Sequence, residues 1–145
     1  MADRLHPLLP GTIAEAADAL RSGALTAVEL TQAAIARADA VDPVLGVFVT
    51  RTDAPALAAA EAVDALRARG EELGPLAGIP LGIKDIVATA DAPTTAQSLA
   101  LDPGFNGDRD AAVVARLREA GAVLTGKTTT MEFAIGGPDP TRPFP

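Results

Sequence analysis

Apolar residues recur at helical spacing in the first 70 residues of the chain. The segment Thr12-Ile-Ala-Glu15 has the form of a capping box and predicts a helix to about Ser22, with Gly23 as its left-handed terminator. Thr26-Ala-Val-Glu29 repeats the signal and predicts a second helix to about Ala40. Four residues would form the apolar face of this second helix: Leu30, Ala33, Ala34 and Ile35.

A strand and a third helix are expected next. Residues 44–50 (VLGVFVT) are apolar and β-branched, which predicts a strand. Asp53 then begins a helix with Pro55 in its first turn, where a proline is tolerated because no backbone donor is needed there. This helix is expected to end near Gly70, and its apolar positions are Leu57, Ala60, Ala62 and Leu66.

The second half of the chain has the pattern of a βαβ unit. Residues 80–87 (PLGIKDIV) predict a buried strand, residues 110–120 an amphipathic helix closed by Gly121, and residues 122–126 a second short strand. A crossover of this length places the two strands parallel in one sheet, so we expect an α/β fold. The residues from Thr129 onward are too rich in proline and glycine to hold regular structure.

The composition narrows the classes of function. A net charge of −7 and a pI near 4.6 disfavour nucleic acid and anionic membranes as partners, because both require a basic protein surface. The absence of cysteine excludes a thiol nucleophile, a disulfide framework and a thiolate zinc site. No apolar run reaches the roughly 18 residues that a membrane-spanning helix needs, so we expect a cytoplasmic protein that does not enter a membrane.

The stretch GAVLTGKT, residues 121–128, matches the phosphate-loop pattern G-x-x-x-x-G-K-[ST]. A phosphate loop follows a strand and begins a helix, so that backbone N–H groups surround the phosphates. Here the predicted helix precedes the first glycine, and apolar strand formers separate the two glycines. Gly121 is better explained as a helix C-terminal residue and Gly126 as a turn at a strand end, so nucleotide binding is not expected.

Lysine is rare in this chain. The 12 basic residues include only two lysines, Lys84 and Lys127, and each lies near the carboxyl end of a predicted parallel strand. Open α/β sheets bind ligands at that edge, and a lysine, unlike an arginine, can lose its proton and act as a base. Lys84 is the stronger candidate because apolar residues precede it. The alternative is a structural lysine paired with Asp85 or Glu132, which Lys127 fits better.

A base needs a nucleophile, and the chain offers few. Of its two serines, Ser22 closes a helix, and Ser98 lies in the loop after the Lys84 strand with no partner signature beside it. His6 is the only histidine, and no second ligand or acid is placed to act with it. The residues therefore support neither a histidine triad nor a metal centre, and no cofactor is expected.

Two segments of the second half resemble a known family. GPLAGIPLGIKDIVATADAPTTAQS and DRDAAVVARLREAGAVLTGKTTTMEFAIGG are similar to the N-terminal part of the amidase signature family, which includes bacterial amidases and the A subunit of the tRNA-dependent amidotransferase. The GIP-x-x-x-KD, TTA, VVARLREAGA, GKT and MEF-A segments occur in order at family-like spacing. The resemblance covers roughly residues 74–145, and the helices before it fit the family's layout.

The resemblance implies a mixed sheet between helices and a hydrolase that cleaves carboxamide C–N bonds with a lysine, a bridging serine and a nucleophilic serine. Lys84 matches the family lysine, which serves as the proton acceptor that activates the serines. Both serines belong to a Gly-Gly-Ser-Ser-Gly type segment that this sequence does not contain, so the chain is expected to be inactive alone. Gln97 stands where many relatives have glycine.

The resemblance thus implies an incomplete amidase domain. Residues 1–73 would form its helical part, and residues 74–145 would form the first part of the sheet with the family lysine. Three explanations stay open. The chain could be a fragment of an enzyme acting on a small-molecule amide, or one chain of a split amidase whose C-terminal partner chain carries the serines. It could also be a non-catalytic module that binds an amide or regulates another protein.

Overall fold

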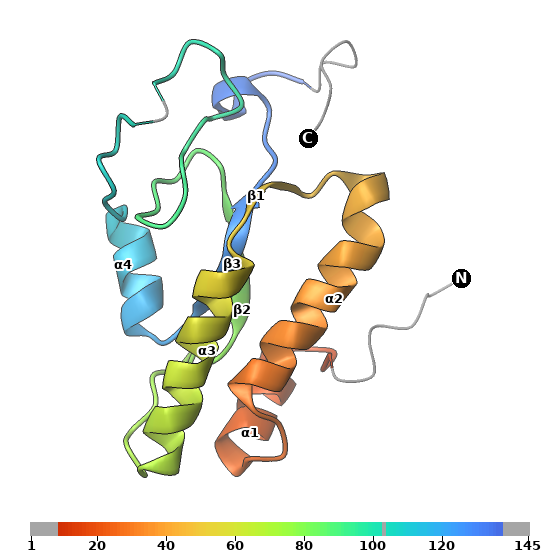
Figure 1. Cartoon of the computed structure of the whole chain (residues 1–145), viewed down its shortest axis with the longest axis vertical. Coiled ribbons are helices and arrows are strands. Elements are labelled where there is room, and N and C mark those ends of the chain that lie inside the picture. The colour runs from red at the N-terminus through yellow and green to blue at the C-terminus, as the bar shows by residue number, and fades with distance from the viewer. Residues whose placement is uncertain (1–8, 103, 138–145) are drawn as a thin grey trace.

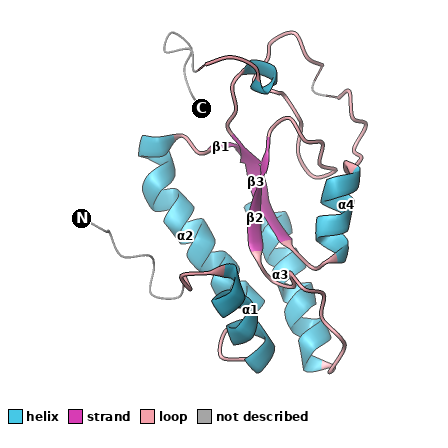
Figure 2. Ribbon diagram, turned by 180° about the vertical axis from the view of Figure 1, so that it is seen from behind, coloured by secondary structure: helices cyan, strands magenta, loops and turns pink. Residues whose placement is uncertain are grey.

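The computed structural model of the chain describes residues 9–102 and 104–137. Figures 1 and 2 show a small sheet at the centre with helices around it, as expected of an α/β fold. The elements are, in order, α1 (Ile13–Ser22), α2 (Ala27–Leu45), β1 (Phe48–Arg51), α3 (Asp53–Ala68), β2 (Pro80–Lys84), α4 (Ala112–Glu119), β3 (Val123–Thr128) and a 3-10 turn, η1 (Glu132–Ala134).

The three strands form one mixed sheet in the order β1-β3-β2. β2 and β3 are parallel, with α4 as the crossover between them, so the predicted βαβ unit is confirmed. β1 pairs antiparallel with β3 on the other side. β3 is therefore the central strand of the described part, and the carboxyl ends of β2 and β3 meet at one edge of the sheet.

Apolar side chains pack on both faces of β3. Val123 points into the larger core, and the next residue, Leu124, packs on the opposite face against Ile83 of β2 and Val114 of α4. Besides Val123, the larger core is built from residues of α1, α2 and α3 and from the segment that leads into β2: Ala16, Leu20, Leu25, Ala27, Leu30, Ala56, Ala60, Val63, Ala77 and Ile79. Both predicted parts of the chain thus share one core.

The helix starts follow the local sequence. At the start of α2, Thr26 and Glu29 form both halves of a capping box, which confirms that prediction. Hydrogen bonds from the backbone N–H of Thr26 and then from its hydroxyl lower the pKa of Glu29. At α1 only one half forms, with the Glu15 N–H donating to Thr12 Oγ1, and Gly23 ends this helix at φ 75° as predicted.

The strand predicted at residues 44–50 begins too early. α2 continues to Leu45, and the strand runs only from Phe48 to Arg51. Pro43 lies in the last turn of α2 without ending it there. Gly46 ends the helix at φ 55°, and the Asp42 carboxylate then accepts the N–H groups of the next two residues, which directs the chain into β1.

The strand predicted at residues 80–87 is shorter and more exposed than expected. β2 ends at Lys84, because the Val87 N–H folds back to the Lys84 carbonyl in a turn. Within β2 only Ile83 is buried, since the strand lies at the edge of the described sheet. The predicted buried strand is in fact an edge strand, and its exposed edge carries Gly82 and Lys84.

Two further predictions in the C-terminal region were wrong. Gly126 is not a turn at a strand end but lies inside β3, with φ 150°. The pairing of β3 shifts register beside it on both sides. The segment after Thr129 also contains one regular turn, η1, although Phe133 within it has φ 50°. His6 and the proline-rich residues 138–145 lie outside the described residues.

Candidate active site

The two lysines lie at the same edge of the sheet. Lys84 is the last residue of β2, and Lys127 is the next to last residue of β3. The parallel register pairs Lys84 with Thr128 and Ile83 with Lys127, so both lysines are at the carboxyl ends of parallel strands as predicted. Their environments are opposite, because Lys84 is exposed whereas Lys127 is 1% exposed.

The ammonium group of Lys127 has three oxygen neighbours inside the protein. It lies 3.0 Å from Asp85 Oδ1, 2.6 Å from Thr94 Oγ1 and 3.2 Å from the Pro93 carbonyl oxygen. Thr94 Oγ1 and the Pro93 carbonyl accept hydrogen bonds from this ammonium, and Asp85 Oδ1 is its ion-pair partner without accepting a hydrogen bond. Lys127 is thus the structural lysine paired with Asp85 that the sequence suggested as the alternative role.

Lys84 has no such partners. Its side chain forms no hydrogen bond or ion pair with any residue of the described ranges. Asp85, one of the two acids considered for it, is bound to Lys127, and the other, Glu132, accepts a hydrogen bond from Ser98. The ammonium of Lys84 therefore projects from the carboxyl edge of β2 toward solvent.

The two serines occupy different structural positions, and neither contacts Lys84. Ser22 is exposed, and its hydroxyl donates to the Ala19 carbonyl of its own helix, as its predicted structural role requires. Ser98 is 8% exposed, and its hydroxyl donates to Glu132 Oε1 at 2.7 Å. The sequence did not reveal this second pair, because 34 residues separate its members.

The loop before Ser98 has a left-handed backbone. Ala96 and Gln97 have φ values of 50° and 45°, a region that glycine adopts without steric cost. This conformation would suit the glycine that the family resemblance implies at position 97. In this chain the Gln97 side chain compensates in part, because its Oε1 accepts the Thr130 N–H. The loop is thereby connected to the segment that follows β3.

Apart from Gly126, the phosphate-loop match has the secondary structure that the sequence predicted for it. Gly121 follows α4 with φ 86°, and its N–H donates to the Arg118 carbonyl at 2.8 Å, as a helix C-terminal glycine does. The rest of the match is strand β3, in which residues 123–127 are buried. Its backbone N–H groups belong to the sheet and form no phosphate cradle.

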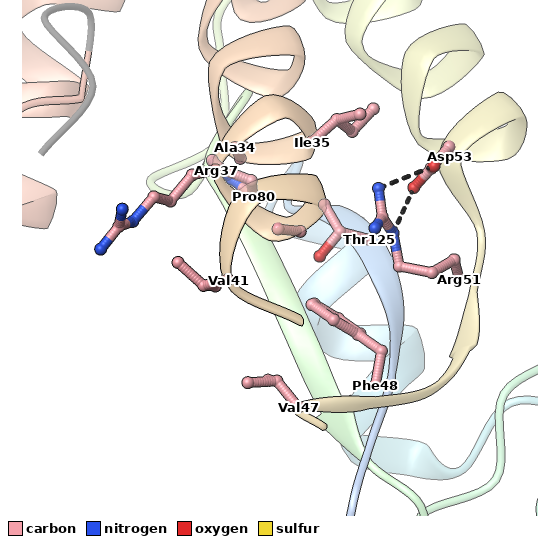
Figure 3. Close-up of a pocket in the computed structure, with 11 residues that line it drawn as sticks. Ala34, Ile35, Arg37, Val41, Val47, Phe48, Arg51, Asp53, Pro80 and Thr125 are labelled. Atoms are coloured by element: carbon pink, nitrogen blue, oxygen red, sulfur yellow. Dashed lines mark hydrogen bonds and ion pairs between the residues drawn. The ribbon is translucent and has the colours of Figure 1, made fainter. Parts of the chain in front are cut away.

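A pocket of about 220 Å³ opens on another part of the molecule, between α2 and the first residues of β1 (Figure 3). Its walls are mostly apolar, and its charged residues are Arg37, Arg51 and Asp53. Partial burial opposes the charge of Arg51, but hydrogen bonds and charge attraction from Asp53 and Asp39 raise its pKa above the ordinary value. Lys84 does not line this pocket, so the candidate site and the pocket are separate features.

Comparison with known proteins gives consistent matches. The sequence profile of the Amidase family matches residues 29–143. The A subunit of the glutamyl-tRNA(Gln) amidotransferase from Chloroflexus aggregans is 50% identical over 125 residues, which are 86% of this chain and 25% of that protein. The corresponding protein of Streptomyces coelicolor is 49% identical over 125 residues, with the same two coverages of 86% and 25%.

Solved structures of amidases also match this chain. The peptide amidase of Stenotrophomonas maltophilia superposes with a TM-score of 0.79 at 39% identity, over 88% of this chain and 26% of that enzyme. A bacterial aryl acylamidase of the amidase signature family, at 23% identity, shares the fold with a TM-score of 0.73 over 84% of this chain and 26% of its own. The chain thus spans about a quarter of the length of the relatives that it matches.

Among the described residues, no helix has both the length and the apolar character needed to cross a bilayer.

Proposed function

The chain belongs to the amidase family, and we propose from this that it is the N-terminal part of an enzyme that hydrolyses carboxamide C–N bonds, with Lys84 as the general base. One observation carries the proposal. Of the two lysines at the carboxyl edge of the sheet, Lys84 alone has an ammonium that binds no other described group. The resemblance of the GIPLGIKD segment to the family also matches Lys84 to the family lysine, which supports the proposal. Lys127 is not the proposed base, because its buried ammonium is paired with Asp85 and hydrogen bonded to Thr94 and Pro93.

The proposed reaction transfers one proton along a short chain of groups. The neutral amine of Lys84 accepts the proton of a bridging serine, which accepts the proton of a nucleophilic serine. The serine oxygen attacks the carboxamide carbon, and the tetrahedral intermediate breaks its C–N bond as the amine leaves with the proton. A water molecule then attacks the acyl-enzyme by the same route, releasing the carboxylic acid and restoring both serines.

The two serines of this reaction are proposed to come from polypeptide outside this sequence. Ser22 caps its own helix, and Ser98 is hydrogen bonded to Glu132, so neither is available to Lys84. The required segment could follow in the same polypeptide or belong to a second chain. Relatives that carry the name of an amidotransferase subunit favour a protein with partner chains. On this proposal, residues 1–73 and 74–145 are parts of one domain, and no cofactor takes part.

The test is complementation. The chain is mixed with a polypeptide carrying the remaining part of the amidase domain of the Stenotrophomonas maltophilia peptide amidase, and ammonia release from a peptide carboxamide is followed. We expect activity only when both polypeptides are present. In Lys84→Ala the activity should fall at least about 100-fold, because a general base contributes roughly 10²–10⁴ to the rate.

Two further variants make the test specific. Lys84→Arg keeps the positive charge at the sheet edge but cannot act as a base, so it should be as inactive as Lys84→Ala. Lys127→Ala should lower the melting temperature of the chain, and its folded fraction should lose less turnover than Lys84→Ala does, because the proposed proton acceptor is still present. Nearly full activity in Lys84→Arg would exclude Lys84 as the base.

A further inference from the structure

Lys84 and the residue after it lie in opposite environments. The side chain of Lys84 is exposed, whereas that of Asp85 is 0% exposed. Successive side chains of an extended segment point to opposite sides, which places one in solvent and the other in the interior. Anything that holds Asp85 in place therefore also holds the backbone from which Lys84 projects.

Asp85 is held by hydrogen bonds of its backbone and of one carboxylate oxygen, and by an ion pair of the other oxygen. Its N–H donates to the Thr128 carbonyl of β3, and its carbonyl accepts the Ala96 N–H, both at 2.9 Å. One carboxylate oxygen, Oδ2, accepts the hydroxyl and the N–H of Thr95. The other, Oδ1, lies 3.0 Å from Lys127 Nζ. Asp85 thus connects the end of β2 to β3 and to the loop that contains Thr95.

Lys127 connects the same three segments from the opposite side. It belongs to β3, it faces Asp85 across the pair of strands, and it donates to Thr94 Oγ1 and the Pro93 carbonyl in the loop. Both members of the ion pair are at least 99% buried. Two apolar residues of similar volume often stabilise a protein as well as a buried ion pair does. Stability alone therefore gives no reason for a charged pair at this place.

We propose that Asp85 and Lys127, together with Thr95, are positioning residues for Lys84. They fix the carboxyl end of β2 against β3 and the loop, so that the amine of Lys84 is presented in one direction at the sheet edge. None of the three would touch the reacting atoms. The inference rests on the proposed function, because positioning matters only if Lys84 is the base.

The first experiment measures the backbone of Lys84 directly. Labelling the chain with [15N]lysine gives two backbone amide signals, since the sequence has only two lysines. Lys84→Arg assigns them. The order parameter of the Lys84 amide should be about 0.85, typical of rigid backbone, and should fall below about 0.6 in Asp85→Asn. Thr95→Val, which keeps the ion pair and loses one hydroxyl, should lower it in the same direction by a smaller amount.

Thr52→Val is the matched control. The Thr52 hydroxyl is also buried and also donates one hydrogen bond, to the Leu124 carbonyl at 3.0 Å, but it contacts neither the loop nor Asp85. This variant should leave the order parameter of Lys84 unchanged even if it lowers the melting temperature. An unchanged order parameter in both Asp85→Asn and Thr95→Val would overturn the positioning role.

The second experiment uses the complemented enzyme. Thr95→Val should lower kcat about tenfold and leave KM within twofold, because it disturbs the base and not the binding of the amide. Thr52→Val should change neither constant. If Lys84→Arg is inactive while kcat of Thr95→Val is unchanged, only the positioning role is wrong. If Lys84→Arg is active, the proposed function is wrong and the positioning role is wrong with it.

Discussion

Lys84 and Lys127 lie at the same edge of the sheet but differ in burial and in partners, because only Lys127 is paired with Asp85. Both were recognisable in the sequence from the rarity of lysine among 12 basic residues. The sequence also named Asp85 or Glu132 as the partner of a structural lysine, but not which of the two, because Asp85 lies 42 positions before Lys127 in the chain, next to Lys84. The register of β2 against β3 decides which lysine meets Asp85.

This difference predicts unequal chemical reactivity. With an amine-acetylating reagent, Lys84 of the folded chain should react as an exposed lysine does, and Lys127 should react at least about 100-fold more slowly. The reason is that Lys127 becomes accessible only when the structure opens, which costs several kcal/mol for a core element. Peptide mass spectrometry at successive times gives both rates.

The unfolded chain in concentrated urea is the control for the labelling experiment, since both lysines should then react at similar rates. Equal rates in the folded chain would contradict the buried position of Lys127. The outcome does not depend on any enzymatic activity, so it tests the geometry of the site separately from the proposed reaction.

At the scale of the elements, local signals predicted more of the helices than of the strands. Caps and terminal glycines lie within a few residues of the helix they end, so the starts of α1, α2 and α3 could be predicted. The ends of β1 and β2 depend on distant groups. Just beyond β2, for example, the Asp85 N–H donates to the Thr128 carbonyl, and the Asp85 carbonyl accepts the Ala96 N–H. Lys84 could be named from the sequence as the candidate base, whereas the choice of Asp85 over Glu132 as the partner of Lys127 could not.

Gly126 shows how a tertiary contact determines a residue type that local rules misread. A Cβ at this position would lie 2.3 Å from the Thr50 carbonyl oxygen and 2.9 Å from the ring of Phe48, both from β1. Its φ of 150° is also one that residues with side chains rarely adopt. The glycine is needed because β1 passes directly against β3.

Gly126→Ala should therefore destabilise the chain by about 3 kcal/mol or more, from the steric overlap and the backbone strain together. Urea denaturation followed by circular dichroism measures the change in the free energy of unfolding. Gly137→Ala is the matched control, since its added Cβ has no atom of the described residues within 4 Å apart from its chain neighbours, and a change within about 0.5 kcal/mol is expected. Equal stabilities of the two variants would show that β1 does not approach β3 in this way.

At the scale of the whole molecule, apolar side chains remain uncovered beside the candidate site. Leu99 is fully exposed, Ile135 is 80% exposed and Phe133 is 47% exposed. Their two segments lie together, because the Phe133 N–H donates to the Ala96 carbonyl and Ser98 donates to Glu132. β2 also has an unpaired edge in the described sheet, and such edges pair readily with other strands.

These features predict that the chain associates with itself when it is alone. Sedimentation velocity should show a weight-average sedimentation coefficient that rises with protein concentration, although the net charge of −7 opposes contact between copies. The double variant Leu99→Ser with Ile135→Ser should weaken association at least about tenfold, since each buried side chain of this size contributes about 1.5–3 kcal/mol. Ile13→Ser, at an exposed apolar position of α1, should not weaken it.

Adding the complementing polypeptide of the activity test should suppress self-association, because it would cover the same surface. A chain that stays monomeric at all concentrations would show that this surface needs no partner, and a split or fragmentary amidase would lose one of its physical arguments.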